Sequence, residues 1–519
     1  MRKFLLATLI GVAASVAAAV PPALEPDTLL EHIKFLSSDE MKGRANGTPE
    51  LERAAEYVAA QFRAAGLRPG GKDNTYFQSF ELVAGLTVGR ANGLSIESPS
   101  GKAPADRRRL TLALGASYYP LAATANENPS VASASLDDVP LVFAGYGLVA
   151  PNVNYDDYEK IDVDGKAVLI FSHEPQEHES NSRLNGNRPM PQTTLQAKAA
   201  AARARGARAL LVVGDPTHAV DEANYKLFAL DPDAENHGIP VLRIRREDMR
   251  PLLDTWKLDA VARQIDADLV PRPRVLDGVT IDYVEHLAVN RRTVRNVIGI
   301  LPGSDPAKAA EAVVIGAHYD HVGIGGRLSV TPERTGEIHN GADDNASGTA
   351  AIIEMAKAAA AERSRFPRTL VFIAFAGEER GLLGSAHYVT DPTVPVADTV
   401  AMLNLDMVGR ARGGVDVSGL EAAPSIEDDL SAAIRAAGNG LEIRRQGPGA
   451  GRSDDSSFIA RQIPAINFFT GFHNDYHRPG DDWDKIDASG TKNVATLALE
   501  LAARLAARAD RPEFVQPRR

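Results

Sequence analysis

Residues of the kinds that bind metal ions stand at the ends of predicted strands in the second half of the chain. They are His318, Asp320, Asp343, Asp344, Glu378, Glu379, Asp406 and His477. Each has an ordinary explanation when taken singly, because Asp commonly caps a helix and a Glu pair can be a charged turn. Together, converging carboxylates would repel one another strongly unless cations lay between them. The set therefore indicates a metal centre.

The chemistry of these side chains suits zinc. His nitrogen and carboxylate oxygen are both zinc ligands, although similar sets can hold cobalt or manganese. Two histidines and three carboxylates suit two ions about 3.5–4 Å apart, with one carboxylate as a bridge. Such a pair would hold a hydroxide, polarise a carbonyl and stabilise the oxyanion that forms. A further carboxylate would move the proton from water to the leaving amine, and Glu378 and Glu379 can divide these tasks.

The elements that must position these residues form an α/β pattern. Apolar runs predict strands at residues 297–301, 312–317, 369–376, 400–405 and 465–469. Ala-rich or amphipathic segments between and after them predict helices at residues 347–362 and 491–508. Continuous apolar strands alternating with helices predict a mixed, mostly parallel sheet with helices on both faces. Ligands of such sheets bind outside the carboxyl ends of the strands.

Five sequence blocks carry a resemblance to a known family. The blocks are His318-x-Asp320, Gly341-Ala-Asp-Asp-Asn-Ala-Ser-Gly348, Gly377-Glu-Glu-Arg-Gly-Leu-Leu-Gly-Ser385, Asn404-Leu-Asp-Met-Val-Gly409 and Asp475-Tyr-His477. In this order they resemble the co-catalytic zinc exopeptidases of metallopeptidase family 28. That family includes secreted bacterial aminopeptidases, glutamate carboxypeptidases and the catalytically silent transferrin receptors.

The resemblance implies a role for each matching position. His318 and Asp406 would bind one zinc ion, and Glu379 and His477 the other. Asp344 would bridge the two ions, with an unusual bend at the peptide to the next residue.

The same resemblance implies which residue transfers the proton from water to the leaving amine. Glu378 would be the general base and acid, and Asp320 would orient His318 from behind. Tyr476 resembles an oxyanion-stabilising tyrosine, although a buried aromatic with a satisfied hydroxyl is an equal alternative. Arg452 could grip a peptide carboxylate, or simply be a solvated loop residue.

Three further histidines flank the metal residues without matching a ligand position. They are His321, His339 and His473, and we interpret them as supports or cleft walls.

A second unit interrupts the catalytic segments. Residues 131–275 resemble the protease-associated (PA) domain, through Val142-Phe-Ala-Gly-Tyr-Gly147 and Gly165-Lys-Ala-Val-Leu-Ile-Phe171, although a generic β-rich insert is an alternative. The resemblance implies a lid or a substrate-shaping wall. The expected catalytic domain comprises residues 20–130 and 276–519.

The N-terminus predicts export. Arg2 and Lys3 precede the apolar segment 4–20, and Ala17-Ala18-Ala19 offers a cleavage site, so residues 1–19 are typical of a signal peptide. The alternative is an uncleaved anchor, but the segment is short and Ala-rich for a membrane span. We expect a periplasmic or extracellular protein with no stable membrane span after cleavage.

Composition excludes other classes of protein. The chain has no cysteine, so neither a disulfide nor a thiolate ligand can form. Its net charge is -11 and no basic run occurs, which argues against a nucleic-acid partner. Oligomeric state stays open.

The leading hypothesis is a zinc aminopeptidase acting on peptides. A carboxypeptidase or dipeptidase would need a basic pocket, for which Arg452 is the candidate. A non-catalytic receptor-like or peptide-binding relative is expected to have lost ligands or the base, and here every such position is filled. A one-zinc cyclotransferase is disfavoured by the complete two-metal set.

Overall fold

The structure is a computed structural model. It describes residues 24–88, 92–100, 106–120, 131–177, 179–184, 191–216, 238–326, 328–331, 334, 336–447 and 453–516. The expected signal peptide, residues 1–19, lies outside these ranges. The chain divides into two compact units, which are described separately. The first comprises residues 1–78, 295–323 and 338–519, and the second residues 79–294 and 324–337.

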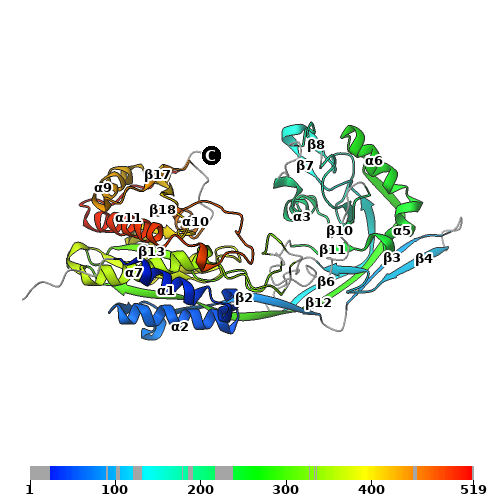
Figure 1. Cartoon of the computed structure of the whole chain (residues 1–519). Coiled ribbons are helices and arrows are strands. Elements are labelled where there is room, and N and C mark those ends of the chain that lie inside the picture. The colour runs from blue at the N-terminus through cyan, green and yellow to red at the C-terminus, as the bar shows by residue number, and fades with distance from the viewer. Residues whose placement is uncertain are drawn as a thin grey trace, which may run out of the picture. The chain divides into compact units, whose positions relative to one another are not determined.

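The first unit is built on a mixed sheet (Figure 1). Its strands lie in the order β17 (Glu442–Arg445), β16 (Gly414–Ser418), β18 (Ala465–Phe469), β15 (Thr399–Leu405), β13 (Ala312–His318), β14 (Thr369–Phe375) and the end of β12 (Arg274–Leu301). The central strands β18, β15, β13 and β14 are mutually parallel. Every residue of β13, β14 and β15 is buried, as expected for strands covered on both faces.

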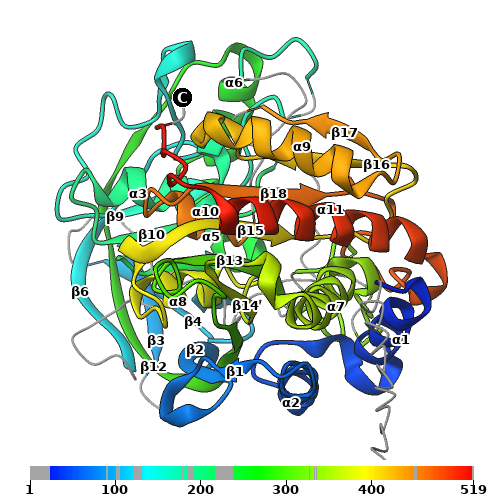
Figure 2. The ribbon, with the colours of Figure 1, turned by 90° about the vertical axis from the view of Figure 1, so that its left-hand side faces the viewer.

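Helices cover this sheet. They are α1 (Pro26–Leu36), α2 (Pro49–Ala64), α7 (Gly348–Ala361), α8 (Leu383–Thr390), α9 (Glu427–Ala437), α10 (Asp455–Ile459) and α11 (Ala488–Ala507). Helices α1, α7 and α11 pack against one another (Figure 2), and α7 and α11 contact β13 and β15. Tyr388 of α8 and Phe458 of α10 instead share an apolar cluster with Val314 and Ile373 of the sheet. The predicted mixed, mostly parallel sheet with flanking helices is confirmed.

The second unit contains the strands on the other side of β12 in the same hydrogen-bonded sheet. Its strands lie in the order β12, β6 (Val131–Phe143), β9 (Ala167–Phe171), β10 (Ala209–Val213), β11 (Val241–Ile244) and β5 (Tyr118–Pro120). The strands from β6 to β11 are parallel, whereas β12 and β5 pair antiparallel at either end. The hairpin of β3 (Gly93–Pro99) and β4 (Arg107–Leu112) also pairs with β12.

Helices α3 (Leu195–Arg203), α5 (Arg246–Thr255) and α6 (Leu258–Asp268) complete the second unit. Ala199 and Ala202 of α3 pack on Val168 and Leu210, so this unit has an apolar core of its own. Residues 79–130 and 276–294 belong to this compact unit. The domain boundaries expected from the sequence, at residues 131 and 275, stay a prediction.

Across the described ranges, no helix has the length and hydropathy needed to cross a membrane.

Candidate metal centre

The parallel strands of the first unit bring the predicted ligands to one edge of its sheet. His318 is the last residue of β13, Glu378 and Glu379 follow β14, and Asp406 follows β15. Because β14, β13 and β15 are adjacent and parallel, their carboxyl ends meet at the same edge.

Two further residues reach this edge from loops. Asp344 lies in the irregular turn of residues 342–347 that leads into α7, and the Asp344–Asn345 peptide is cis. This is the bend that the resemblance implied at that peptide. His477 lies in the loop between β18 and α11.

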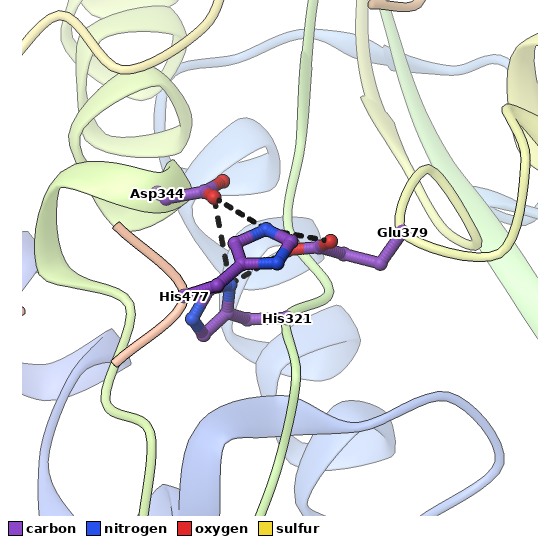
Figure 3. A group of neighbouring side chains, drawn as sticks. All are labelled: His321, Asp344, Glu379 and His477. Atoms are coloured by element: carbon purple, nitrogen blue, oxygen red, sulfur yellow. Dashed lines mark hydrogen bonds and ion pairs between the residues drawn. The ribbon is translucent and has the colours of Figure 1, made fainter. Parts of the chain in front are cut away.

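Asp344 faces two histidines with its two carboxylate oxygens. Oδ1 lies 3.3 Å from Nε2 of His318, and Oδ2 lies 3.2 Å from Nε2 of His477. On one side, Nε2 of His318 is also 3.3 Å from Oδ1 of Asp406. On the other side, Nε2 of His477 is 3.0 Å from Oε2 of Glu379, as Figure 3 shows. The five predicted ligands therefore form two groups that share one carboxylate.

This donor set fits divalent metal ions. Atoms bound tetrahedrally at about 2.0–2.2 Å are separated by roughly 3.3–3.6 Å. The separations of 3.0–3.3 Å given above are close to that spacing, and each group combines imidazole nitrogen with carboxylate oxygen. The side chains thus need only small adjustments to coordinate one ion in each group.

Without metal, the histidines must supply the positive charge. Burial opposes the protonation of His477, but Glu379 and Asp344 outweigh it and raise its pKa to about 11. Burial opposes ionisation of Asp344 as well, but hydrogen bonds from His318 and His477 hold its pKa well below the usual range. Metal binding would therefore release protons from the histidines.

The adjacent glutamates have different environments. Burial, Glu379 and Asp406 raise the pKa of Glu378 well above its ordinary value. Burial and Asp344 act in the same direction on Glu379, but His477 and His321 outweigh them and lower its pKa to about 2. In the metal-free chain, Glu378 thus favours the protonated form, whereas Glu379 favours the ionised form.

Asp320 contacts more than the histidine it was expected to orient. Nδ1 of His318 is 3.2 Å from the backbone carbonyl oxygen of Asp320 and 3.8 Å from its carboxylate. That carboxylate accepts the backbone N–H groups of Glu378 and Glu379, at 3.2 and 3.3 Å, and a bond from Asn46 at 2.6 Å. Asp320 therefore fixes the turn that carries the Glu–Glu pair.

Arg44 is a support that the sequence motifs did not reveal. It is fully buried in the segment between α1 and α2, and its guanidinium donates to backbone carbonyls. The acceptors include Tyr319, Asn340 and Gly341, at 2.8–3.0 Å. Arg44 thus links the N-terminal helices to the loops that carry His318 and Asp344.

Arg410 is a second buried support. Its guanidinium lies 2.8 Å from Asp475 and 2.7 Å from Asp481. The other oxygen of Asp481 accepts the backbone N–H groups of Asp343 and Asp344, both at 3.0 Å. No motif marked Arg410 or Asp481, because their importance comes from contacts between loops distant in sequence.

Asp343 is not a member of either ligand group. Its carboxylate accepts the backbone N–H of Gly409 at 2.6 Å and lies 3.2 Å from Nε2 of His473. His473 is therefore a support, as expected from the sequence. His321 is more closely involved, because its Nδ1 lies 2.7 Å from Oε1 of Glu379.

A cleft of about 570 Å³ opens onto the two ligand groups. Its lining residues are His318, Asp344, Glu378, Asp406, Met407, Ser453, Asn467, Phe469, Phe472, Tyr476 and His477. The ring of Tyr476 stacks on His477 with centroids 4.0 Å apart, and also contacts Phe472. Arg452 lies outside the described residues.

Comparisons with known proteins agree with this architecture. Residues 296–502 match the model of peptidase family M28, and residues 138–252 match that of the PA domain. The aminopeptidase YwaD of Bacillus subtilis is 26% identical over 337 residues, which cover 62% of this chain and 62% of that protein. Leupeptin-inactivating enzyme 1 of Streptomyces exfoliatus is 32% identical over 177 residues, 34% of this chain and 36% of that protein. The chain thus spans less than two thirds of the length of these curated relatives.

Solved structures extend the similarity of fold over most of the chain. An aminopeptidase from Aneurinibacillus sp. strain AM-1 has a TM-score of 0.55 at 23% identity, covering 95% of this chain and 96% of that one. A zinc aminopeptidase from Bacillus subtilis, BSAP, has a TM-score of 0.51 at 22% identity, covering 95% of this chain and 98% of that one.

Proposed function

We propose that the chain is a zinc-dependent aminopeptidase of peptidase family M28, whose model matches residues 296–502, with a PA domain before these residues. The observation that carries the proposal is the carboxylate of Asp344, which faces a histidine on either side, each of which also contacts a second acid. The relative YwaD and the solved structure from Aneurinibacillus are named aminopeptidases, and BSAP, which has the same fold, is described as a zinc aminopeptidase.

We assign two zinc ions to the centre. His318 and Asp406 would hold one, Glu379 and His477 the other, and Asp344 both. When bound, the two ions would lower the pKa of a water molecule and polarise the carbonyl of the scissile peptide bond.

Glu378 is the proton carrier in this proposal. It lines the cleft, and its Oε2 lies 4.0 Å from Nε2 of His318 without joining either ligand group. A carboxylate close to the ions but free of them can take a proton from water and deliver it to the leaving amine. The upward shift of its pKa supports the protonated half of that cycle.

Tyr476 and Asp320 have auxiliary roles. The Tyr476 ring is held by His477 and Phe472 at the cleft wall, so its hydroxyl is available to stabilise an oxyanion. Asp320 positions Glu378 through the backbone N–H that it accepts. A substrate-binding role for Arg452 stays a prediction.

Charge around the cleft favours an aminopeptidase over a carboxypeptidase. Its described lining has neither Lys nor Arg that could pair with a terminal carboxylate, and because Asp344 and Asp406 are assigned to the ions, Glu378 is the acid of this wall that is not bound to metal. Such a wall suits the ammonium group of a peptide N-terminus better than a terminal carboxylate. Amino-blocked and carboxyl-blocked forms of the same peptides test this choice. Cleavage of the amino-blocked forms alone would overturn the assignment.

A glutamate-to-glutamine exchange tests the mechanism. We expect Glu378→Gln to reduce kcat by at least about 10²-fold, the lower range for general acid–base catalysis, with zinc content unchanged. Glu442→Gln, at an exposed position on β17, is the matched control and should retain full activity. Wild-type activity in Glu378→Gln would refute the assigned role.

Export is also part of the proposal. We propose that residues 1–19 are removed during secretion, which leaves a periplasmic or extracellular enzyme. Intact-mass measurement of the protein recovered outside the cytoplasm should show loss of these residues. A full-length mass there would support an uncleaved anchor instead.

A further inference from the structure

His321 stands directly against one of the assigned zinc ligands. It comes three residues after His318 in the loop beyond β13, and it is buried. Its Nδ1 lies 2.7 Å from Oε1 of Glu379, as Figure 3 shows. The other oxygen, Oε2, lies 3.0 Å from Nε2 of His477. The two oxygens of Glu379 therefore face different histidines.

His321 lies close enough to Asp344, Glu379 and His477 to be a candidate ligand itself, but its spacing differs from theirs. Ligand atoms sharing one tetrahedral ion are roughly 3.3–3.6 Å apart. His321 is closer than this to Glu379, at hydrogen-bond distance, and farther from Asp344, whose Oδ2 is 3.9 Å from its Nδ1. A ligand of the same ion would be nearly equidistant from both carboxylates.

In the contact between His321 and Glu379, the hydrogen-bond donor is Nδ1 of His321. A carboxylate that binds zinc is ionised and can only accept a hydrogen bond. Nδ1 of His321 must then be the donor. The ring Nε2 is buried and has no hydrogen-bond partner among the described residues, so Glu379 is the only such contact found for this ring.

The surroundings hold the ring in place. The backbone N–H of His321 donates to the carbonyl of Arg44, and the ring meets that of His477 edge-on at 5.5 Å. Gly341 packs against it, since a Cβ there would lie 2.4 Å from Cδ2 of His321. The backbone bond fixes the residue and the two packing contacts restrict the ring, so its N–H points in one direction.

We propose that His321 is a positioning residue for the zinc ligand Glu379. By donating Nδ1–H to Oε1, it would leave Oε2, the oxygen 3.0 Å from Nε2 of His477, to bind the ion assigned to Glu379, His477 and Asp344. The inference rests on the zinc centre proposed above and adds a residue that controls how one ligand presents itself. Supports of this kind typically contribute about 10–100-fold to metal affinity.

Zinc titration of the full chain tests this role. The metal-free protein is titrated with zinc against a chromophoric chelator, and the affinities of the two ions are fitted separately. We expect His321→Leu to weaken one ion by about 10–100-fold and to leave the other near its wild-type affinity. His321→Asn should recover most of the loss, because an Asn amide can place an N–H close to the position of Nδ1.

His32→Leu is the matched control. His32 is another buried histidine of the first unit that pairs with a carboxylate, its Nε2 lying 2.9 Å from Glu354. Its loss should lower stability without changing either zinc affinity. The number of histidines bound per zinc, from X-ray absorption, should be the same in wild type and His321→Leu.

Two outcomes would overturn the inference. Wild-type affinities in His321→Leu would show that the contact does not position Glu379. Equal losses in the Leu and Asn variants, with fewer histidines bound per zinc, would show that His321 is itself a ligand. Failure of the wild-type chain to bind zinc or cleave peptides would instead refute the proposed function.

Discussion

Replacing Arg410 by Met should destabilise the first unit far more than an ordinary lost ion pair. Arg410 is only 6% exposed and joins Asp475 and Asp481 from the centre of the ligand loops. Met keeps much of the length of the side chain but removes the charge and the donors. Asp481, which is fully buried, would lose its 2.7 Å partner.

The size of the effect follows from burial. Removing one partner of a buried pair leaves an uncompensated charge and costs about 3–5 kcal/mol. Asp481 also accepts the N–H groups of Asp343 and Asp344, so its movement would release the backbone beneath the shared ligand. Arg445 offers a control, because its pair with Glu427 has side chains 44% and 41% exposed. Exposed pairs contribute about 0–1 kcal/mol.

The two tryptophans make the assay specific. Trp483 lies in the first unit, and Trp256 belongs to the second. In a Trp256→Phe background, fluorescence during urea unfolding reports the first unit through Trp483. Arg410→Met and Arg445→Met are compared with chelator present, so that metal binding does not contribute to the difference.

The double variant identifies the cause. If the unpaired charge of Asp481 causes the loss of stability, the double variant Arg410→Met with Asp481→Asn should lose less free energy of unfolding than the two single variants together. A loss for Arg410→Met no larger than for Arg445→Met would refute the reasoning. Strict additivity in the double variant would place the cost elsewhere.

Three further outcomes are expected. Chelation should lower the thermal midpoint of the first unit and zinc should restore it, since a ligand at 100 times its Kd stabilises by about 2.7 kcal/mol; an unchanged midpoint would argue against a bound metal. Gly341→Ala should cost about 1–3 kcal/mol in urea unfolding, because a Cβ would lie 2.2 Å from the carbonyl of Asp344 at a φ of +59°, whereas Gly440→Ala at φ +71° meets nothing within 4 Å and should cost less. Burial raises the pKa of Asp157 to about 7, so the native carboxyl keeps a proton that the unfolded chain loses from about pH 4 upward. Stability of the second unit, followed by Trp256 fluorescence, should therefore fall between about pH 4 and 7, and Asp157→Asn should weaken that dependence.

The sequence predicted the parts of the centre that depend on strand periodicity. Apolar runs located β13, β14 and β15, and parallel pairing then required His318, the Glu–Glu pair and Asp406 to meet at one edge. The sequence also predicted a resemblance to this family and to the PA domain, and the two family models match residues 296–502 and 138–252. Local pattern was sufficient here because the ligands are fixed to the ends of regular elements.

The supports could not be predicted in the same way. Asp481 holds the backbone of Asp344 from 137 positions away, and Arg44 reaches Gly341 across 297. These contacts depend on how irregular loops fold over one another, and no periodicity encodes that. His321 was noticed only as a neighbour of the motif, since its contact with Glu379 depends on the course of two loops.

The positions of Arg44 and Arg410, the buried arginines nearest the ligand loops, explain why the centre still needs metal ions to balance its charge. Every hydrogen bond from the Arg44 guanidinium goes to a backbone carbonyl, and Arg410 pairs with Asp475 and Asp481. Both cations therefore lie behind the ligand loops, where they fix the backbone, and neither contacts the carboxylates that face the cleft. Among the described residues, the positive groups in contact with those carboxylates are histidines, and the histidines must give up their protons to become ligands. An arginine placed between the carboxylates would neutralise them permanently and exclude an ion, whereas this arrangement keeps their charge available for cations that can also activate water.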